Sequence, residues 1–259
     1  MNVLSMGDRI RPGAYAVKAR FARSVLLLGE ADRALFIVDR SIGAGPLNLV
    51  ADNPHVFATG ESLAIPSRCP VRRFDSAMPR LSPAERAALL QVLESSLPRY
   101  APAESLVSLF FPAKRLSRVL QARNALFQAA FAHFASGRLK VGIRLIRGCG
   151  EGLTPSGDDF LCGMILACRL RRNPAAANYI LERARGQNPV SNAFLELSAQ
   201  GRVNVAVQRL LQSPAPARIK AVCAFGHGSG SDLLCGIRYG LVSLRLFRRE
   251  RVQRRRWAS

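Results

Sequence analysis

The stretch SGDDFLCG at residues 156–163 occurs a second time, with two substitutions, as SGSDLLCG at residues 229–236. Each copy follows a glycine-rich approach, GCGEG at residues 148–152 in the first case and GHG at residues 226–228 in the second. A Ser or Asp near the start of each copy is a typical helix cap, and the apolar residues after it continue a helix. The repeat therefore predicts two helices of similar construction, each opened by a glycine-rich turn.

A glycine inside each predicted helix, Gly163 in the first and Gly236 in the second, indicates how the two helices pack. Glycine in a helix interior costs about 1 kcal/mol relative to alanine, so it usually marks the close approach of another backbone. We therefore expect the two helices to cross at these glycines, with both N-termini pointing at one shared cleft.

The two glycine-rich turns have the properties of an anion site. Their glycines permit positive φ and leave backbone N–H groups open, and a helix N-terminus attracts negative charge. Two such turns predict a site for a dianion such as a phosphate or a dicarboxylate. The alternative interpretation is two well-capped helix starts with no ligand. The predicted substrate-binding residues are Gly148, Gly150, Gly152, Thr154, Ser156, Gly157, Gly228, Ser229, Gly230 and Asp232.

Three side chains in these turns are candidates for chemistry. Asp158 and Asp159 are adjacent acids, of which one can cap the helix while the other acts as general base or binds Mg²⁺. An ordinary P-loop is excluded, because it requires Lys and then Ser or Thr at these two positions. His227 stands between two glycines, where it could polarise a carbonyl, although a lone histidine is usually structural. We predict catalytic roles for Asp158, Asp159 and His227, with the two aspartates as candidate metal ligands.

The remainder of the chain predicts an α+β fold, with a small N-terminal β-rich module packed on a larger, mostly α-helical domain. The module spans residues 1–80 and the helical domain spans residues 81–259. Short apolar runs bounded by turn residues predict strands at residues 25–28, 34–38, 56–58 and 63–65. An apolar run at residues 221–225 also resembles a strand. Helices are predicted at residues 82–97, 117–135, 158–171, 175–185, 191–199, 203–212 and 232–248.

The composition limits the partners and the compartment. The net charge is +21, and six arginines crowd residues 248–256, so an RNA or another acidic partner is one interpretation. No aromatic residues interleave with the basic ones as in a base-stacking surface, so we consider nucleic acid unlikely and a solvated basic tail the simpler explanation. We expect a cytoplasmic protein, because we find no apolar run long enough for a membrane span and no signal peptide. The six cysteines form no C-x-x-C pair, which predicts reduced, mostly buried thiols.

The two glycine-rich segments resemble the AllH-like family. GCGEGLTPSGDDFLCG at residues 148–163 is similar to the family signature. GHGSGSD at residues 226–232 is similar to its G-H-T-S-G-x-D turn, with Gly228 in place of Thr. The resemblance implies a role in the catabolism of purine and allantoin nitrogen, as a subunit of oxamate carbamoyltransferase. That enzyme interconverts oxalurate and phosphate with oxamate and carbamoyl phosphate, and the resemblance implies FdrA-like and AllG-like partner subunits.

Three hypotheses about function follow. The first is a subunit of a carbamoyl-transfer enzyme that binds carbamoyl phosphate, phosphate, oxamate or oxalurate at the two turns, with no certain cofactor beyond the candidate Mg²⁺. The second is a non-catalytic subunit or sensor that binds a small anion in the same place. The third is a basic protein that contacts nucleic acid through its C-terminal tail.

Overall fold

The computed structural model describes residues 2–111 and 116–243, and these residues form an α+β fold, which confirms the predicted fold class. The chain divides into two compact units. A β-rich unit contains residues 2–79 and 202–212, and a helical unit contains residues 80–201 and 213–243.

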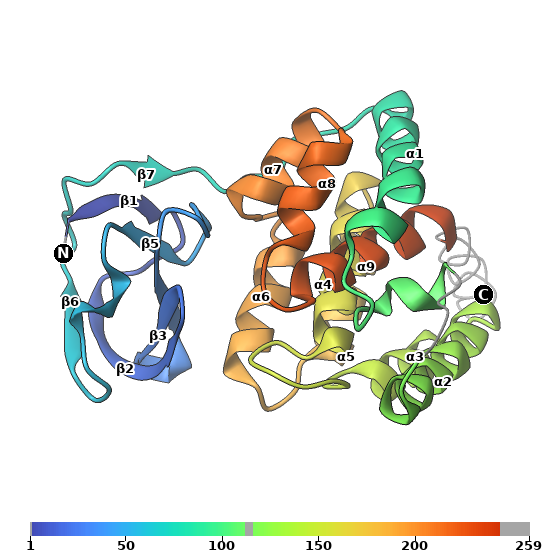
Figure 1. Ribbon diagram of the computed structural model, residues 1–259, viewed down its shortest axis with the longest axis horizontal. Helices are drawn as coiled ribbons and strands as arrows, with labels where there is room; N and C mark the ends of the chain where they lie inside the picture. The colour runs from blue at the N-terminus through green and yellow to red at the C-terminus, as the bar shows by residue number, and fades with distance from the viewer. Residues whose placement is uncertain (1, 112–115, 244–259) are drawn as a thin grey trace, which may run out of the picture. The chain divides into compact units, whose positions relative to one another are not determined.

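The β-rich unit contains a seven-stranded mixed sheet, curved into a half-barrel, in the order β6-β2-β3-β4-β5-β1-β7 (Figure 1). Its neighbouring strands are antiparallel except for the pairs β4–β5 and β1–β7. Buried side chains such as Val25, Leu35 and Ile37 form its core and exclude water from one face. The strands are β1 (Val3–Gly7), β2 (Gly13–Phe21), β3 (Ser24–Gly29), β4 (Ala34–Val38), β5 (Asn48–Ala51), β6 (Ser62–Ile65) and β7 (Arg73–Phe74).

Three of the four predicted strands are present, as β3, β4 and β6. The strand predicted at residues 56–58 is wrong, because Val56 ends a 3-10 turn, η2 (Pro54–Val56), instead. Asn53 caps this turn by accepting a hydrogen bond from the His55 N–H at 3.0 Å, and Pro54 occupies its first position. A second 3-10 turn, η1 (Glu30–Asp32), connects β3 to β4.

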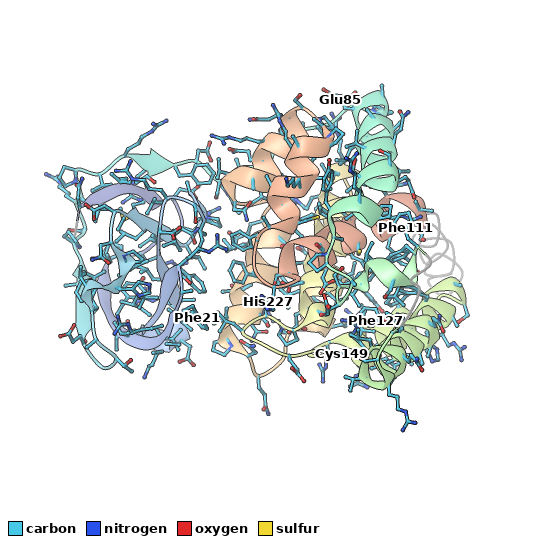
Figure 2. All side chains as sticks on the ribbon, in the orientation of Figure 1. Phe21, Glu85, Phe111, Phe127, Cys149 and His227 are labelled. Atoms are coloured by element: carbon cyan, nitrogen blue, oxygen red, sulfur yellow. The ribbon has the colours of Figure 1, made fainter. Side chains whose placement is uncertain are left out.

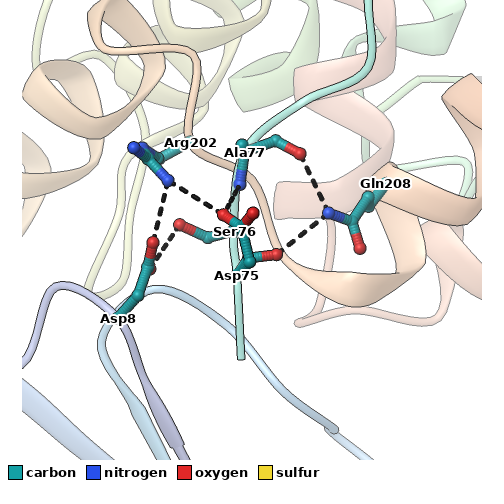
Figure 3. Close-up of polar contacts among 6 residues, drawn as sticks. All are labelled: Asp8, Asp75, Ser76, Ala77, Arg202 and Gln208. Atoms are coloured by element: carbon teal, nitrogen blue, oxygen red, sulfur yellow. Dashed lines mark hydrogen bonds and ion pairs between the residues drawn. The ribbon is translucent and has the colours of Figure 1, made fainter. Parts of the chain in front are cut away.

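Helix α7 (Val205–Gln212) lies in the β-rich unit, although it comes late in the sequence. Arg202 forms ion pairs with Asp8 at 2.8 Å and with Asp75 at 3.1 Å (Figure 3). The Gln208 amide of α7 donates to the Asp75 carbonyl at 3.0 Å. The sequence predicted this segment to belong to the helical domain, because contacts between residues so distant along the chain leave no local pattern.

The helical unit is built around α4 and α9, which lie side by side at its centre (Figure 1). α4 is buried along almost its whole length. The α-helices of this unit are α1 (Pro83–Tyr100), α2 (Arg118–Ala135), α3 (Leu139–Ile146), α4 (Ser156–Leu170), α5 (Pro174–Ala184), α6 (Pro189–Ala199), α8 (Pro216–Cys223) and α9 (Ser229–Ser243), together with the 3-10 helix η3 (Leu106–Leu109).

Local signals account for the start of α1. The Ser82 hydroxyl accepts from the Glu85 N–H at 3.2 Å, and the Glu85 carboxylate accepts from the Ser82 N–H at 2.6 Å, which completes the predicted capping box. The run at residues 221–225, expected to resemble a strand, lies at the end of α8 and beyond it, so that prediction is wrong. The predicted helix 232–248 begins earlier, at Ser229, and its last residues lie outside the described part of the chain, as does the arginine-rich tail.

The six cysteines are free thiols, and four of them are buried, as the sequence predicted. Between residues 2 and 111 and between residues 116 and 243, no helix combines the length and the apolar character that a membrane crossing requires.

Candidate functional site

The repeated segments meet where α4 and α9 cross. A Cβ atom added to Gly163 would lie 2.1 Å from the Leu233 carbonyl oxygen, and one added to Gly236 would lie 2.0 Å from the Phe160 carbonyl oxygen. Both distances are far below van der Waals contact, so only glycine permits this approach of the two backbones. The crossing inferred from the sequence is therefore confirmed.

The glycine-rich turn before α4 is folded by hydrogen bonds within its own backbone. The Cys149 N–H donates to the Ile146 carbonyl at 3.0 Å, and the Gly157 N–H donates to the Cys149 carbonyl at 2.8 Å. Gly157 packs so closely on Ile146 that an added Cβ would lie 1.7 Å from the Ile146 carbonyl oxygen. α3 and α4 are therefore joined tightly through residues 147–155, which we call loop 1.

The turn before α9 repeats this construction. The Phe225 N–H donates to the Val222 carbonyl at 3.0 Å, and the Gly230 N–H donates to the Phe225 carbonyl at 3.1 Å. A Cβ added to Gly230 would lie 1.9 Å from the Val222 carbonyl oxygen. We call residues 224–228 loop 2. The internal repeat thus extends from the eight aligned residues, six of them identical, to two complete helix–loop–helix elements, α3–α4 and α8–α9.

The two helix starts exchange partners. Asp159 of α4 hydrogen-bonds the Ser229 hydroxyl of α9, and Asp232 of α9 hydrogen-bonds the Ser156 hydroxyl of α4. Ser156 and Ser229 are equivalent in the repeat, and so are Asp159 and Asp232. Thr154 of loop 1 joins this arrangement, because its hydroxyl donates to Asp159 at 3.1 Å and lies 3.0 Å from the Ser229 hydroxyl. The N-termini of α4 and α9 are therefore adjacent.

The carboxyls of Asp159 and Asp232 are unusual in their protonation. Burial raises the pKa of Asp159 well above its ordinary value, and the nearby charges of Asp232 and Asp158 raise it further, against hydrogen bonds from Ser229 and Thr154. Burial also raises the pKa of Asp232, to about 6, although the Leu106 N–H, which donates at 2.7 Å, favours its charged form. Asp159 therefore keeps its proton to a higher pH than Asp232 does.

Asp158 has a different position from its neighbour. Its carboxylate accepts from the Gly148 N–H at 2.7 Å, so it closes loop 1 across the start of α4. In the described part of the chain, no group of three or more His, Cys, Asp or Glu side chains is arranged to hold a metal ion. Mg²⁺ binding by Asp158 and Asp159 stays a prediction.

Several predicted binding glycines use their N–H groups inside the protein, including Gly148, Gly157 and Gly230. Across the described residues, the N–H groups of Gly150 and Gly228 donate no hydrogen bond, and the same holds for Gly152. Gly150 and Gly152 are exposed and Gly228 is half-buried, so among the predicted binding glycines these three have amides without a partner in the described residues.

His227 lies in loop 2 with its side chain exposed. Figure 2 labels it together with Cys149, which lies in loop 1 and is half-buried. Loop 2 leads directly into α9, so His227 lies beside the helix start that is the predicted binding place. The catalytic role of His227 stays a prediction.

Sequence reasoning missed Arg123 of α2. Its guanidinium donates to the Glu104 carbonyl at 2.6 Å and to the Ser105 carbonyl at 3.1 Å, while its Nε is buried without a partner in the described residues. Burial raises the pKa of both Cys149 in loop 1 and Asp232 in α9, and the charge of Arg123 opposes that rise at each of them, so Arg123 lies near both helix starts. Arg123 is one arginine within an ordinary amphipathic helix, and no local signal distinguishes it.

A third helix start borders loop 1. The Asn188 side chain caps α6 by accepting from the Val190 and Ser191 N–H groups at 3.0 Å and 3.1 Å. Its amide nitrogen donates to the Leu153 carbonyl of loop 1 at 2.9 Å. The N-terminus of α6 is therefore attached to the loop that opens α4.

The fold and the site define an α+β protein in which two copies of a helix–loop–helix element enclose buried, hydroxyl-bonded carboxyls. Residues 146–241 match a family model, described as oxamate carbamoyltransferase subunit AllH. This match confirms the resemblance expected from the two loops, and it spans both of them. No curated protein and no solved structure gives a significant match to the chain.

Proposed function

We propose that this chain is a subunit of a carbamoyl-transfer enzyme of the oxamate carbamoyltransferase type, acting in purine and allantoin nitrogen catabolism. The observation that carries the proposal is the reciprocal bonding of Asp159 to Ser229 and of Asp232 to Ser156, at the point where two helix N-termini meet. The family match over residues 146–241 supports the reaction class.

The phosphate of carbamoyl phosphate would bind at the loops. The N–H groups of Gly150, Gly152 and Gly228 can donate to its oxygens, and the positive ends of α4 and α9 favour its charge. Arg123 adds a positive charge near both helix starts. Glycines in the two loops suit phosphate binding, because the backbone must approach the anion closely.

The transfer step forms a bond between the oxamate nitrogen and the carbamoyl carbon, and it breaks the bond between that carbon and a phosphate oxygen. Phosphate leaves with the electron pair, and the oxamate nitrogen gives up a proton. Asp232, with a pKa of about 6, would accept that proton at neutral pH. Asp159 would stay protonated and donate a hydrogen bond to the carbamoyl oxygen as negative charge develops on it, while Thr154 holds the Asp159 carboxyl in place. His227 would be a further donor.

This assignment gives the two equivalent aspartates different roles. Asp158 would have a structural role, because its carboxylate already accepts from Gly148. Asp158 and an ionised Asp159 would be the residues that hold Mg²⁺, which would supply positive charge to the phosphate. The family description as a subunit favours protein partners, and we propose FdrA-like and AllG-like chains.

A second function is favoured by one observation, namely that all three carboxyls at the helix starts already have hydrogen-bond partners within the protein. The chain would then bind the anion without catalysis, as a binding subunit or a sensor.

Carbamoyl transfer from carbamoyl phosphate to oxamate tests the proposal. The full chain is assayed alone and together with FdrA-like and AllG-like subunits, with the variants Asp159→Asn and Asp232→Asn as a matched pair. We expect Asp232→Asn to lower the rate by about 10²–10⁴-fold, the usual contribution of a general base. Asp159→Asn should keep most of the activity, because Asn imitates a neutral carboxyl. Full activity in both variants supports the non-catalytic function, and the reverse ranking contradicts the assignment of roles.

A further inference from the structure

The hydroxyl of Ser191, in the first turn of α6, is buried and has no function in the fold. Ser191 is 3 % exposed, and its Oγ finds no hydrogen-bond partner among the described residues. Buried hydroxyls are nearly always paired, because an unpaired one loses its hydrogen bonds to water without replacement. Alanine at this position would therefore suit the folded protein better than serine does.

Capping does not explain this serine. The cap of α6 is Asn188, whose side-chain oxygen already accepts from the Val190 and Ser191 N–H groups. By contrast, Ser198 lies two turns further along the same face of α6 and hydrogen-bonds the Cys162 thiol of α4. The two serines are similarly buried, so burial alone does not account for the unpaired Oγ of Ser191, a state that among the described serines it shares with Ser231 at the start of α9.

Ser191 lies between two contacts of α6, one with loop 1 and one with α4, which show that this face of α6 is turned toward them. Before it, the Asn188 amide donates to the Leu153 carbonyl of loop 1, and after it, Ser198 reaches Cys162 of α4. α6 therefore runs alongside loop 1 and α4 in the same direction. Counting along both segments from these contacts brings Ser191 level with Ser156, the first residue of α4. Its hydroxyl thus faces the start of α4, where the carboxyl of Asp232 bonds Ser156.

We propose that Ser191 is a substrate-binding residue that donates a hydrogen bond to the carboxylate end of oxamate or oxalurate. The inference rests on the proposed function, in which the loop amides hold the phosphate. A carboxylate at the other end of the reacting pair needs its own donor, and the hydroxyl of Ser191 is an unpaired donor on the α6 side of that place. The positive end of α6 favours the same negative charge.

Calorimetric titration of the full-length chain with phosphate, carbamoyl phosphate, oxamate and oxalurate tests this inference. The variant is Ser191→Ala, and Ser198→Ala on the same face of α6 is the matched control. We expect Ser191→Ala to weaken oxamate and oxalurate binding by about tenfold, the usual effect of one lost hydrogen bond to a charged group, while phosphate and carbamoyl phosphate bind as before. Ser198→Ala should leave all four affinities unchanged.

The melting temperature gives a second readout. Ser191→Ala should melt at the same or a higher temperature than the wild type, because it removes an unpaired polar group, whereas Ser198→Ala should melt lower. Ser191→Cys, a weaker donor of similar size, serves if the alanine variant does not fold. Unchanged oxamate and oxalurate affinity, or an equal loss for all four ligands, overturns the role of Ser191 but leaves the proposed function standing. If the wild-type chain binds none of the four ligands, the proposed function itself is overturned.

Discussion

Asp159 of α4 hydrogen-bonds Ser229 of α9, and the same bond recurs between the equivalent pair, Asp232 and Ser156. Each carboxyl is therefore held by a residue from the other copy of the repeat. Neither helix start can move without breaking a contact of the other. The arrangement holds the starts of α4 and α9 next to one another, and a helix start attracts negative charge.

The close crossing of α4 and α9 predicts a large effect of adding one methyl group. We expect Gly163→Ala and Gly236→Ala each to lower the free energy of unfolding by about 1–3 kcal/mol, because the new Cβ would overlap a backbone carbonyl of the other helix. Gly186→Ala is the control, since an added Cβ there has nothing within 4 Å, and it should change the stability by less than about 1 kcal/mol. Urea denaturation of the three variants measures this. Wild-type stability in both crossing variants would contradict the packing.

The raised pKa of Asp232 predicts that stability falls with rising pH. The folded state keeps this proton up to about pH 6, whereas the unfolded chain releases it near the ordinary value of 3.8. Between these values the unfolded state binds fewer protons, so the free energy of unfolding decreases as the pH rises. The contribution is fully present below pH 3.8 and lost above about pH 6, and it amounts to roughly 3 kcal/mol.

Asp232→Asn removes this titration while retaining an oxygen for the Leu106 N–H. We therefore expect the stability of the variant relative to wild type to increase between pH 4 and pH 7 by up to about 3 kcal/mol. Urea denaturation at several pH values gives the difference directly, and titrating groups that do not interact with Asp232 cancel in the comparison. Parallel pH profiles for the two proteins would show that the Asp232 carboxyl is not perturbed.

The ion pairs of Arg202 predict how strongly the segment 202–212 is held in the β-rich unit. Arg202→Ala should lower the free energy of unfolding by about 1.5–3 kcal/mol, the range for hydrogen bonds to charged groups, because its partner Asp8 is mostly shielded from water. Arg33→Ala breaks the exposed pair with Glu30 and should cost less than about 1 kcal/mol. Limited proteolysis should cut the Arg202→Ala variant faster within residues 202–212. If Arg202→Ala and Arg33→Ala lose the same free energy of unfolding, the ion pairs of Arg202 stabilise the protein no more than the exposed pair does.

Local sequence patterns predicted much of the fold and the crossing. The repeat at residues 156–163 and 229–236 indicated both central helices, and the glycines within them indicated where they cross. The Ser82 capping box marked the start of α1. These features depend on residues close together in the chain, so their signals are complete within a short window.

Other features depend on distant residues. α3 and α8 have eight residues each, too few for a clear helical period, and the apolar end of α8 resembled a strand. The position of Arg123 near Asp232 joins α2 to α9, and the hydrogen bond from the Asn188 amide nitrogen to the Leu153 carbonyl joins α6 to loop 1. The sequence identified Asp159 and Asp232 as polar residues at helix starts, but their exchange of serine partners follows from tertiary packing alone.

We propose that amides of loops 1 and 2 bind a small anion, and NMR of the glycine amides tests this binding. The chain has 20 glycines, and selective ¹⁵N-glycine labelling makes each loop amide observable in the full-length protein. On titration with carbamoyl phosphate, we predict saturable shifts of the Gly150, Gly152 and Gly228 signals, with Gly60 and Gly137 unmoved. Loop signals that stay in place while the ligand reaches millimolar concentration, or shifts confined to glycines outside loops 1 and 2, would contradict the account.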